Sequence, residues 1–212
     1  MIRFSSTLPL KYSKSHKNYL NSFTNIRDRR IETFPFSQNL SQSQEQQLER
    51  LGESYHEHRR QLMLAIQLYL TKTCNLFHAQ LLRQIAPEEE QLDDKTLQKQ
   101  LGKDAAHLRK HLAKTPGTIT FNEAVSGIKK LRNLHHQMDN AVLEAYGWQD
   151  INIRHNFYEV EYLSETDRTR YTIYPDARRE ILKRLLELNH EIHAWEVADG
   201  LLERKGVGKR RV

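Results

Sequence analysis

The side chains of this chain that could do chemistry are its histidines, a cysteine and paired carboxylates. Of the 11 histidines, the closely spaced ones are His56 with His58, His135 with His136, and His190 with His193. A structural zinc site needs two ligand pairs at zinc-like spacing, but no second pair with such spacing follows His56 and His58, and the sequence has no Cys-x-x-Cys. The sequence therefore predicts no metal site.

No nucleophile or acid–base pair stands out among the remaining candidates. Cys74 is the single cysteine, which excludes an internal disulfide and is typical of an inert structural thiol in a reducing cytosol. Glu159 and Glu161 alternate as on a solvated strand face, without a partner base. Neither a glycine-rich phosphate loop nor a Ser or Cys nucleophile motif is present. We expect no catalytic residues and no bound cofactor.

Arginine clusters are the best candidates for binding. The chain has a net charge of +6, which is compatible with a polyanionic partner. The candidates for contact with a DNA phosphate backbone are Arg27, Arg29, Arg30, Arg59 and Arg60. Each of them also fits a solvated loop or helix surface, so the residues alone leave both interpretations open.

The first element that must position these groups is a long helix over 41–70. Ser41 suits its N-cap and Glu45 its first turn. Apolar residues then recur every three or four positions, at Leu48, Leu51, Tyr55, His58, Leu62, Ala65 and Tyr69. We interpret His58 as a core or edge histidine with a local hydrogen bond, in preference to a ligand.

The centre of the chain is a helix–hairpin–helix unit. Its first helix places Ile128, Leu131, Leu134, Met138, Val142 and Ala145 on one face and ends near Gly147. Its second helix begins at Pro175 and places Ile181, Leu185, Leu188, Ile192 and Trp195 on one face. We expect the two stripes to be buried against each other or a third helix. Alternating residues over about 157–174 predict a β-hairpin between the helices.

These elements predict a mainly α fold, in which long amphipathic helices pack as a bundle with one small β-hairpin. The expected segments are a basic N-terminal region (1–38), the long helix with a connector (39–86), an exposed insertion (87–118), the helix–hairpin–helix unit (119–203) and a basic tail (204–212). The sequence lacks a run of about 20 apolar residues, and no apolar stretch of a signal peptide follows Met1. We expect a cytoplasmic protein without a membrane partner.

Several strings, in their order and spacing, resemble the C-terminal end of type IIG and IIL restriction–modification enzymes, which methylate adenine N6 in DNA. They are Glu32-Thr33-Phe34-Pro35-Phe36, 51–60 (LGESYHEHRR), 70–78 (LTKTCNLFH), 134–142 (LHHQMDNAV), 145–148 (AYGW), 170–173 (RYTI), 177–182 (ARREIL) and 188–191 (LNHE). The resemblance covers about residues 31–203.

In that family a nuclease or accessory region, a methyltransferase domain and a target-recognition region precede the helical C-terminal segment. The methyl donor is S-adenosylmethionine and the catalytic signature is Asn-Pro-Pro-Tyr or Asn-Pro-Pro-Phe. The present sequence lacks that signature, the donor-binding motif and the nuclease motif. The resemblance therefore implies the end of a recognition region with its helical tail, and gives no catalytic residue to transfer to this chain.

Two functions follow as hypotheses. In the first, the chain is a non-catalytic specificity or scaffold module that contacts DNA or braces a recognition region, together with a separate methyltransferase or nuclease subunit. In the second, it is a helical protein–protein interaction module without a DNA role, which docks on a partner or on itself. A chain that stays monomeric at high concentration would contradict the self-association version.

Overall fold

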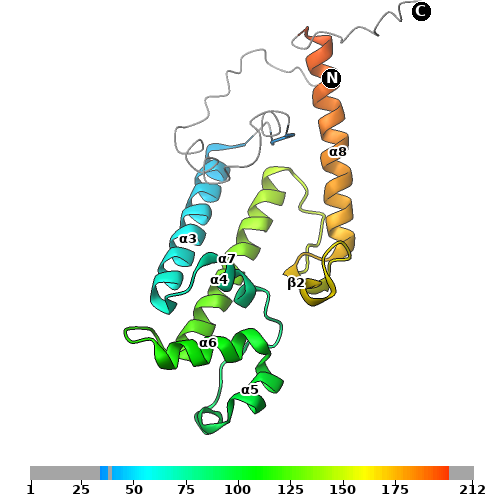
Figure 1. The fold of residues 1–212 in the computed structure, drawn as a ribbon. Coiled ribbons are helices and arrows are strands. Elements are labelled where there is room, and N and C mark those ends of the chain that lie inside the picture. The colour runs from blue at the N-terminus through cyan, green and yellow to red at the C-terminus, as the bar shows by residue number, and fades with distance from the viewer. Residues whose placement is uncertain (1–33, 38–39, 201–212) are drawn as a thin grey trace, which may run out of the picture. The chain divides into compact units, whose positions relative to one another are not determined.

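The structure is a computed structural model, and it describes residues 34–37 and 40–200. Figure 1 shows the mainly helical fold with one small antiparallel sheet that the sequence predicted. The described residues belong to two units. Residues 37–186 form the larger unit, and residues 34–36 and 187–200 belong to the other. In the latter, the rings of Phe34 and Phe36 lie 4.8 Å apart between centroids.

Helix α3 (Gln42–Ile66) begins where the sequence predicted. Ser41 caps it by accepting a hydrogen bond from the Gln44 amide, and the Gln44 side chain accepts one from the Ser41 amide in return. The helix ends earlier than expected because Gln67 adopts a left-handed conformation with φ of 51°. Tyr69, expected at the end of the buried stripe, consequently lies beyond the helix and is 87% exposed.

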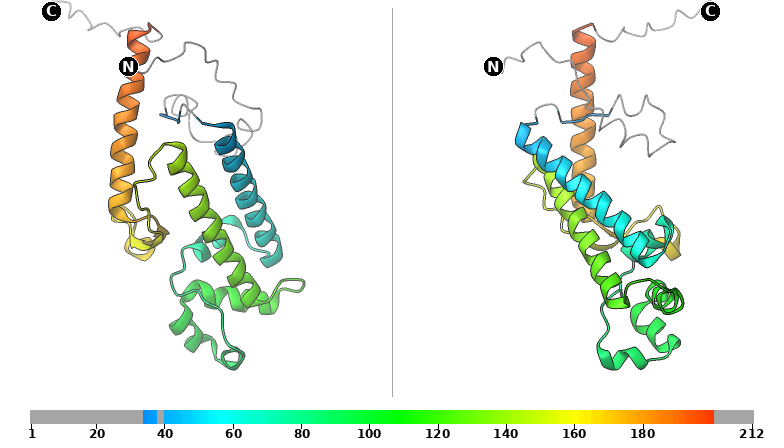
Figure 2. Two further views of the ribbon diagram at one scale, coloured as in Figure 1. Left: turned by 180° about the vertical axis from the view of Figure 1, so that it is seen from behind. Right: turned by 90° about the vertical axis from the view of Figure 1, so that its left-hand side faces the viewer.

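Helix α7 (Phe121–Ala145) lies antiparallel beside α3, as the views in Figures 1 and 2 both show. The two helices approach closely at Gly127, where a Cβ atom would lie 2.5 Å from a methyl group of Leu62. At the same place Nε2 of His58 donates a hydrogen bond to the Gly127 carbonyl oxygen over 2.8 Å. His58 is thus a half-buried, hydrogen-bonded residue as expected, but the expectation of a local partner is wrong, because the acceptor lies on the other helix.

The expectation of an exposed insertion over 87–118 is wrong. This segment contains a 3-10 turn (Pro87–Gln91), α5 (Asp94–Leu101) and α6 (Lys103–Lys114). Leu97, Leu101 and Leu108 are each at most 2% exposed and pack in the main core with α3, α4 (Leu70–Phe77) and α7. The many charged residues between these leucines suggested exposure, but they occupy the outer faces of two short amphipathic helices.

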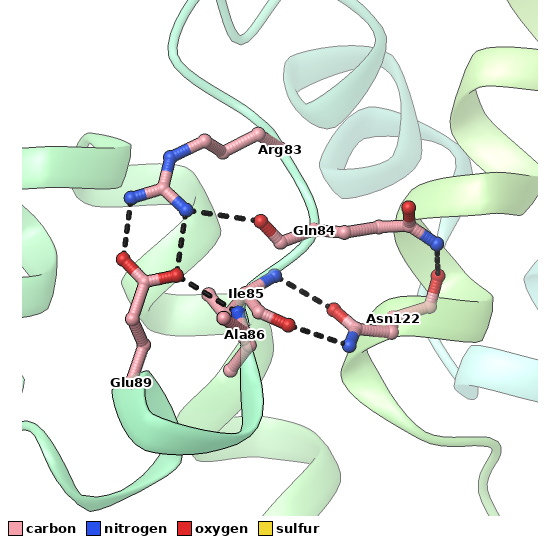
Figure 3. A network of polar contacts seen from close by, with 6 residues as sticks. All are labelled: Arg83, Gln84, Ile85, Ala86, Glu89 and Asn122. Atoms are coloured by element: carbon pink, nitrogen blue, oxygen red, sulfur yellow. Dashed lines mark hydrogen bonds and ion pairs between the residues drawn. The ribbon is translucent and has the colours of Figure 1, made fainter.

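Side chains fasten the connector after α4 to the first turn of α7, as Figure 3 shows. The Asn122 amide pairs with the backbone of Ile85, accepting from its N–H and donating to its carbonyl, each over 2.9 Å. On the other side of the connector, the Arg83 guanidinium forms a two-pronged ion pair with Glu89 at 2.6 and 2.8 Å. These contacts satisfy the polar backbone of a segment that has no regular structure.

The predicted hairpin is present with shorter strands. Strand β1 (Asn156–Glu159) pairs antiparallel with β2 (Thr169–Thr172), and Phe157 lies opposite Tyr171. A 3-10 turn (Glu165–Asp167) falls within the connection between the strands.

Helix α8 (Pro175–Ala198) begins at the predicted proline, but its predicted apolar stripe is only half-buried at Ile181, Leu185, Leu188 and Ile192 and is exposed at Trp195. Ala177 is the only residue of the described helix classed as buried. Ala177 and Ile181 pack on a small second core formed by Leu143 of α7 and by Ile151 and Ile153 of the loop that follows α7. No described helix combines the length and apolar character needed to cross a membrane.

The buried position of α5 can be tested by comparing two leucines. Leu101→Ala should lower the free energy of unfolding by about 3 kcal/mol because it leaves a cavity in the core. Leu64→Ala is the matched control, since Leu64 is 59% exposed on α3, and it should change stability by less than about 0.5 kcal/mol. Urea titration followed by circular dichroism measures both values. Equal effects of the two substitutions would contradict the assignment of α5 to the core.

Candidate functional site

A groove of about 530 Å³ opens in the larger unit between α3, α4, α7, the hairpin and the start of α8. We call it the arginine groove. Its polar and aromatic lining residues are Arg59, Arg170, Arg178, Tyr55, Tyr162, Tyr171, Phe77, Thr73, Thr172, Cys74, His78 and His135. None of its lining residues in the described chain is a carboxylate, so the groove favours an anion.

The three arginines come from separate elements. Arg59 belongs to α3 and its guanidinium carbon lies 5.5 Å from the centre of the Tyr55 ring. Arg170 is on β2 and pairs with Asp167 at 3.1 Å, but Asp167 lies outside the groove. Arg178 is in the first turns of α8. Guanidinium groups present planar forks of N–H donors, which match the oxygens of phosphate and carboxylate.

A buried arginine holds the walls of the groove together. Arg132 of α7 is 9% exposed and donates hydrogen bonds to three carbonyl oxygens at the end of α4, those of Leu76, Phe77 and Ala79, at 3.2, 2.9 and 2.9 Å. Its guanidinium carbon also lies 5.0 Å from the centre of the Phe157 ring and 5.3 Å from that of Tyr171. One side chain therefore connects α7, α4 and both strands of the hairpin.

His78, just after α4, connects the groove to the hairpin. Its Nδ1 accepts a hydrogen bond from the Tyr171 amide over 3.2 Å, so this nitrogen is unprotonated. Burial lowers the pKa of His78 to about 4, and the positive charges of Arg170 and Arg132 add to the effect. The imidazole is therefore neutral near pH 7 and serves as a fixed acceptor.

A cluster of two histidines and an aspartate borders the groove through His135. His135 and Asp139 are four residues apart on α7, so they share one face of the helix. His155 precedes β1, and its Nε2 lies 2.7 Å from Oδ2 of Asp139, while Nε2 of His135 lies 3.4 Å from the same oxygen. Burial lowers the pKa of His135, which favours its neutral form. Within the described chain these are the only residues grouped closely enough to hold a metal ion.

The arginines that the sequence predicted to contact DNA lie in different surroundings. Arg59 lines the groove, and its contact with DNA stays a prediction. Arg60 does not line the groove, and its guanidinium pairs with Glu57 at nitrogen–oxygen distances of 2.7 and 2.8 Å. The expected sites at Arg27, Arg29 and Arg30 lie outside the described residues.

The sequence alone did not point to Arg170 and Arg178 in the groove, or to Asp139 and His155 in the histidine–aspartate cluster. The sequence did contain one local signal, the i, i+4 spacing of His135 and Asp139, but a histidine–aspartate pair does not fit the cysteine and histidine pattern of structural zinc sites. His155 lies 16 residues after Asp139. Arg170 and Arg178 had no local feature that separated them from surface arginines. Cys74, interpreted as an inert structural thiol, is exposed and lines the groove.

No protein-family model, curated protein or solved structure matches the chain significantly. What the groove and the histidine–aspartate cluster can bind is therefore inferred from their geometry alone. The resemblance to restriction–modification enzymes rests only on the sequence strings.

The role of Arg132 predicts a large loss of stability on substitution. Arg132→Met keeps most of the volume but leaves the α4 carbonyls without donors, and it should lower the free energy of unfolding by about 3 kcal/mol. Arg132→Lys should recover only part of this loss, because a single ammonium group replaces a planar fork. Urea titration measures both variants, with Lys129→Met on the exposed face of α7 as control. An Arg132→Met variant as stable as the control would contradict this role.

The lowered pKa of His78 predicts a loss of stability in acid. Between the ordinary pKa of 6.5 and the folded value of about 4, the unfolded chain binds a proton at this side chain that the folded chain does not. This contribution to stability is intact above the upper value, is lost as the pH falls through the window, and levels off below it. His78→Asn keeps an acceptor but does not titrate, so its urea midpoint should fall less than that of the wild type between pH 7 and pH 5. Equal decreases would contradict the assignment.

Proposed function

We propose that this chain is a non-catalytic, DNA-contacting module of a restriction–modification system that methylates adenine N6. In this proposal it acts in the cytoplasm with a separate methyltransferase or nuclease subunit, and the arginine groove contacts the sugar–phosphate backbone. The proposal assigns no chemical step to the chain itself.

The observation that carries the proposal is the lining of the groove. Arg59, Arg170 and Arg178 converge there from three elements, and no carboxylate shares the lining in the part of the chain that the structure describes. Phosphate oxygens are the most abundant ligands that DNA offers to such groups, and contacts with them position a protein without reading sequence. The net charge of +6 adds long-range attraction to the same partner.

The aromatic side chains of the groove support a nucleic acid over a small inorganic anion. Tyr55, Tyr162 and Tyr171 line the same space, and Tyr162 is 83% exposed. Exposed tyrosines beside arginines are suited to stacking on bases or packing against sugars, whereas a free phosphate would use only the cations. The eight family-like strings support the particular kind of DNA enzyme, and several groove residues, including Tyr55, Cys74 and His135, fall within them.

A second candidate function is supported by helix α8. Leu182 and Leu186 are 60% and 56% exposed and lie four residues apart, so they form an apolar patch on one face of the helix. A protein partner, or a second copy of the chain, would bury these leucines. This candidate needs neither DNA nor the arginine groove.

The DNA proposal predicts binding with a steep dependence on salt. A fluorescently labelled duplex of mixed sequence should bind the purified chain at 50 mM salt and bind much more weakly at 200 mM. The slope of log affinity against log salt should have a magnitude of about 0.9 for each phosphate contacted. Arg59→Ala, Arg170→Ala and Arg178→Ala should each weaken binding and reduce the magnitude of the slope by about one. Fluorescence anisotropy titrations measure these changes.

Arg83→Ala provides the matched control. It removes the same charge, but Arg83 pairs with Glu89 and does not line the groove. Its effect on the slope should be clearly smaller than that of the groove variants. Absence of binding at 50 mM salt, or equal effects of all four substitutions, would overturn the assignment of DNA contact to the groove.

A further inference from the structure

The histidine–aspartate cluster has the composition of a metal site. Two imidazole nitrogens and one carboxylate form a common ligand set for divalent ions of the first transition series, Zn²⁺ among them. His135 and Asp139 come from adjacent turns of α7, and the chain returns after Gly147 to bring His155 against them. The ligand atoms of the three residues all lie within 4.8 Å of one another.

The distances from the two Nε2 atoms to the Asp139 oxygen are close to what such an ion needs. Tetrahedral zinc with bonds of 2.0–2.1 Å places its ligand atoms about 3.3 Å apart. The distance of 3.4 Å between Nε2 of His135 and Oδ2 of Asp139 already has this size. The 2.7 Å distance from His155 to the same oxygen is that of a hydrogen bond. It has to open by only about 0.6 Å when an ion replaces the shared proton.

Hydrogen bonds satisfy His135, Asp139 and His155 only in part. Both Nε2 atoms approach one oxygen of Asp139, which satisfies His155 well and His135 only at long range. The Nδ1 atoms of both rings are buried and have no partner among the described residues. An ion bound through Nε2 leaves these Nδ1 atoms without partners, so the observation that favours an ion is the single Asp139 oxygen shared by both Nε2 atoms. An ion between the three residues would engage both Nε2 lone pairs and the carboxylate at once.

The surroundings allow a cation to enter. Asp139 and the His135 side chain are each about one-third exposed, at 30% and 31%, while His155 is 1% exposed and fixed in place. The His136 ring stacks on the His155 ring with centroids 4.6 Å apart, which restrains the buried ligand.

We propose that His135, Asp139 and His155 bind one divalent transition-metal ion of the Zn²⁺ type through Nε2 of each histidine and the aspartate carboxylate. A fourth position is left for water or for an anionic oxygen from the arginine groove, which His135 also lines. Ligating histidines usually donate their second N–H to an acceptor, and loss of such a partner weakens binding by about 10–100-fold. We therefore expect moderate affinity. This inference does not depend on DNA binding.

Cobalt titration of the purified full chain tests the site. Co²⁺ absorbs visible light more strongly when histidine and carboxylate ligands hold it in a tetrahedral site than when it is free in water. We expect a visible band that saturates at one equivalent of Co²⁺ after prior removal of metal with a chelator, and that Zn²⁺ abolishes. Zn²⁺ should also raise the thermal unfolding midpoint. All measurements use the Cys74→Ser background, which removes the thiol as a ligand.

Three ligand variants and one control decide the assignment. His135→Gln, Asp139→Asn and His155→Ala should each lose the band and the stabilisation by Zn²⁺. His107→Ala removes an exposed histidine of α6 and should keep both. His135→Gln keeps the test valid if His155→Ala fails to fold, because His135 is partly exposed. Absence of a stoichiometric band, or its retention in a folded ligand variant, would overturn the proposal, as would an equal loss in His107→Ala.

Discussion

The hydrogen bonds of Arg132 with the end of α4 are the interaction on which the rest of this arrangement depends. A buried charge is stable only when other groups replace its hydration. The described partners of Arg132 include no carboxylate, and three carbonyl oxygens and two aromatic rings take that role. The carbonyls at a helix C-terminus lack partners within the helix and bear the negative end of its dipole, so a cation there is favourable. The arrangement links α7 to α4, because the buried guanidinium needs acceptors and the carbonyl oxygens at the end of α4 need donors.

The same side chain places the hairpin. Because the Phe157 and Tyr171 rings both lie near the guanidinium, one residue from each strand is fixed relative to α7. The bond from the Tyr171 amide to His78 adds a second connection, this time to the residue after α4. Hairpins of two short strands are marginally stable by themselves, so these contacts decide where this one lies. The position of the hairpin brings Arg170 into the groove. Its first strand begins directly after His155, which contacts Asp139.

The groove and the histidine–aspartate cluster meet at His135 but differ in charge. The groove contains guanidinium groups without a carboxylate in its described lining, whereas the cluster contains the carboxylate of Asp139. Arg132, which precedes His135 by one turn of α7, directs its charge to the α4 carbonyls and away from the cluster. An anion and a cation could therefore be bound side by side, and an anionic oxygen in the groove would be attracted to an ion held by the cluster.

The sequence by itself determined the helices, several of their ends and the hairpin, because these depend on neighbouring residues. Ser41 and Pro175 were correctly placed at helix starts, and the alternation over 157–174 located the strands. Only the tertiary structure decided which apolar faces are covered. The stripe of α8 was expected in the core and α5 and α6 outside it, but the periodicity of a helix shows that it has an apolar face without showing what packs there. The groove and the cluster were decided in the same way. Arg59, Arg170 and Arg178 are far apart in the chain, and His155 meets Asp139 only because the chain folds back after α7, so no local pattern in the sequence could bring them together.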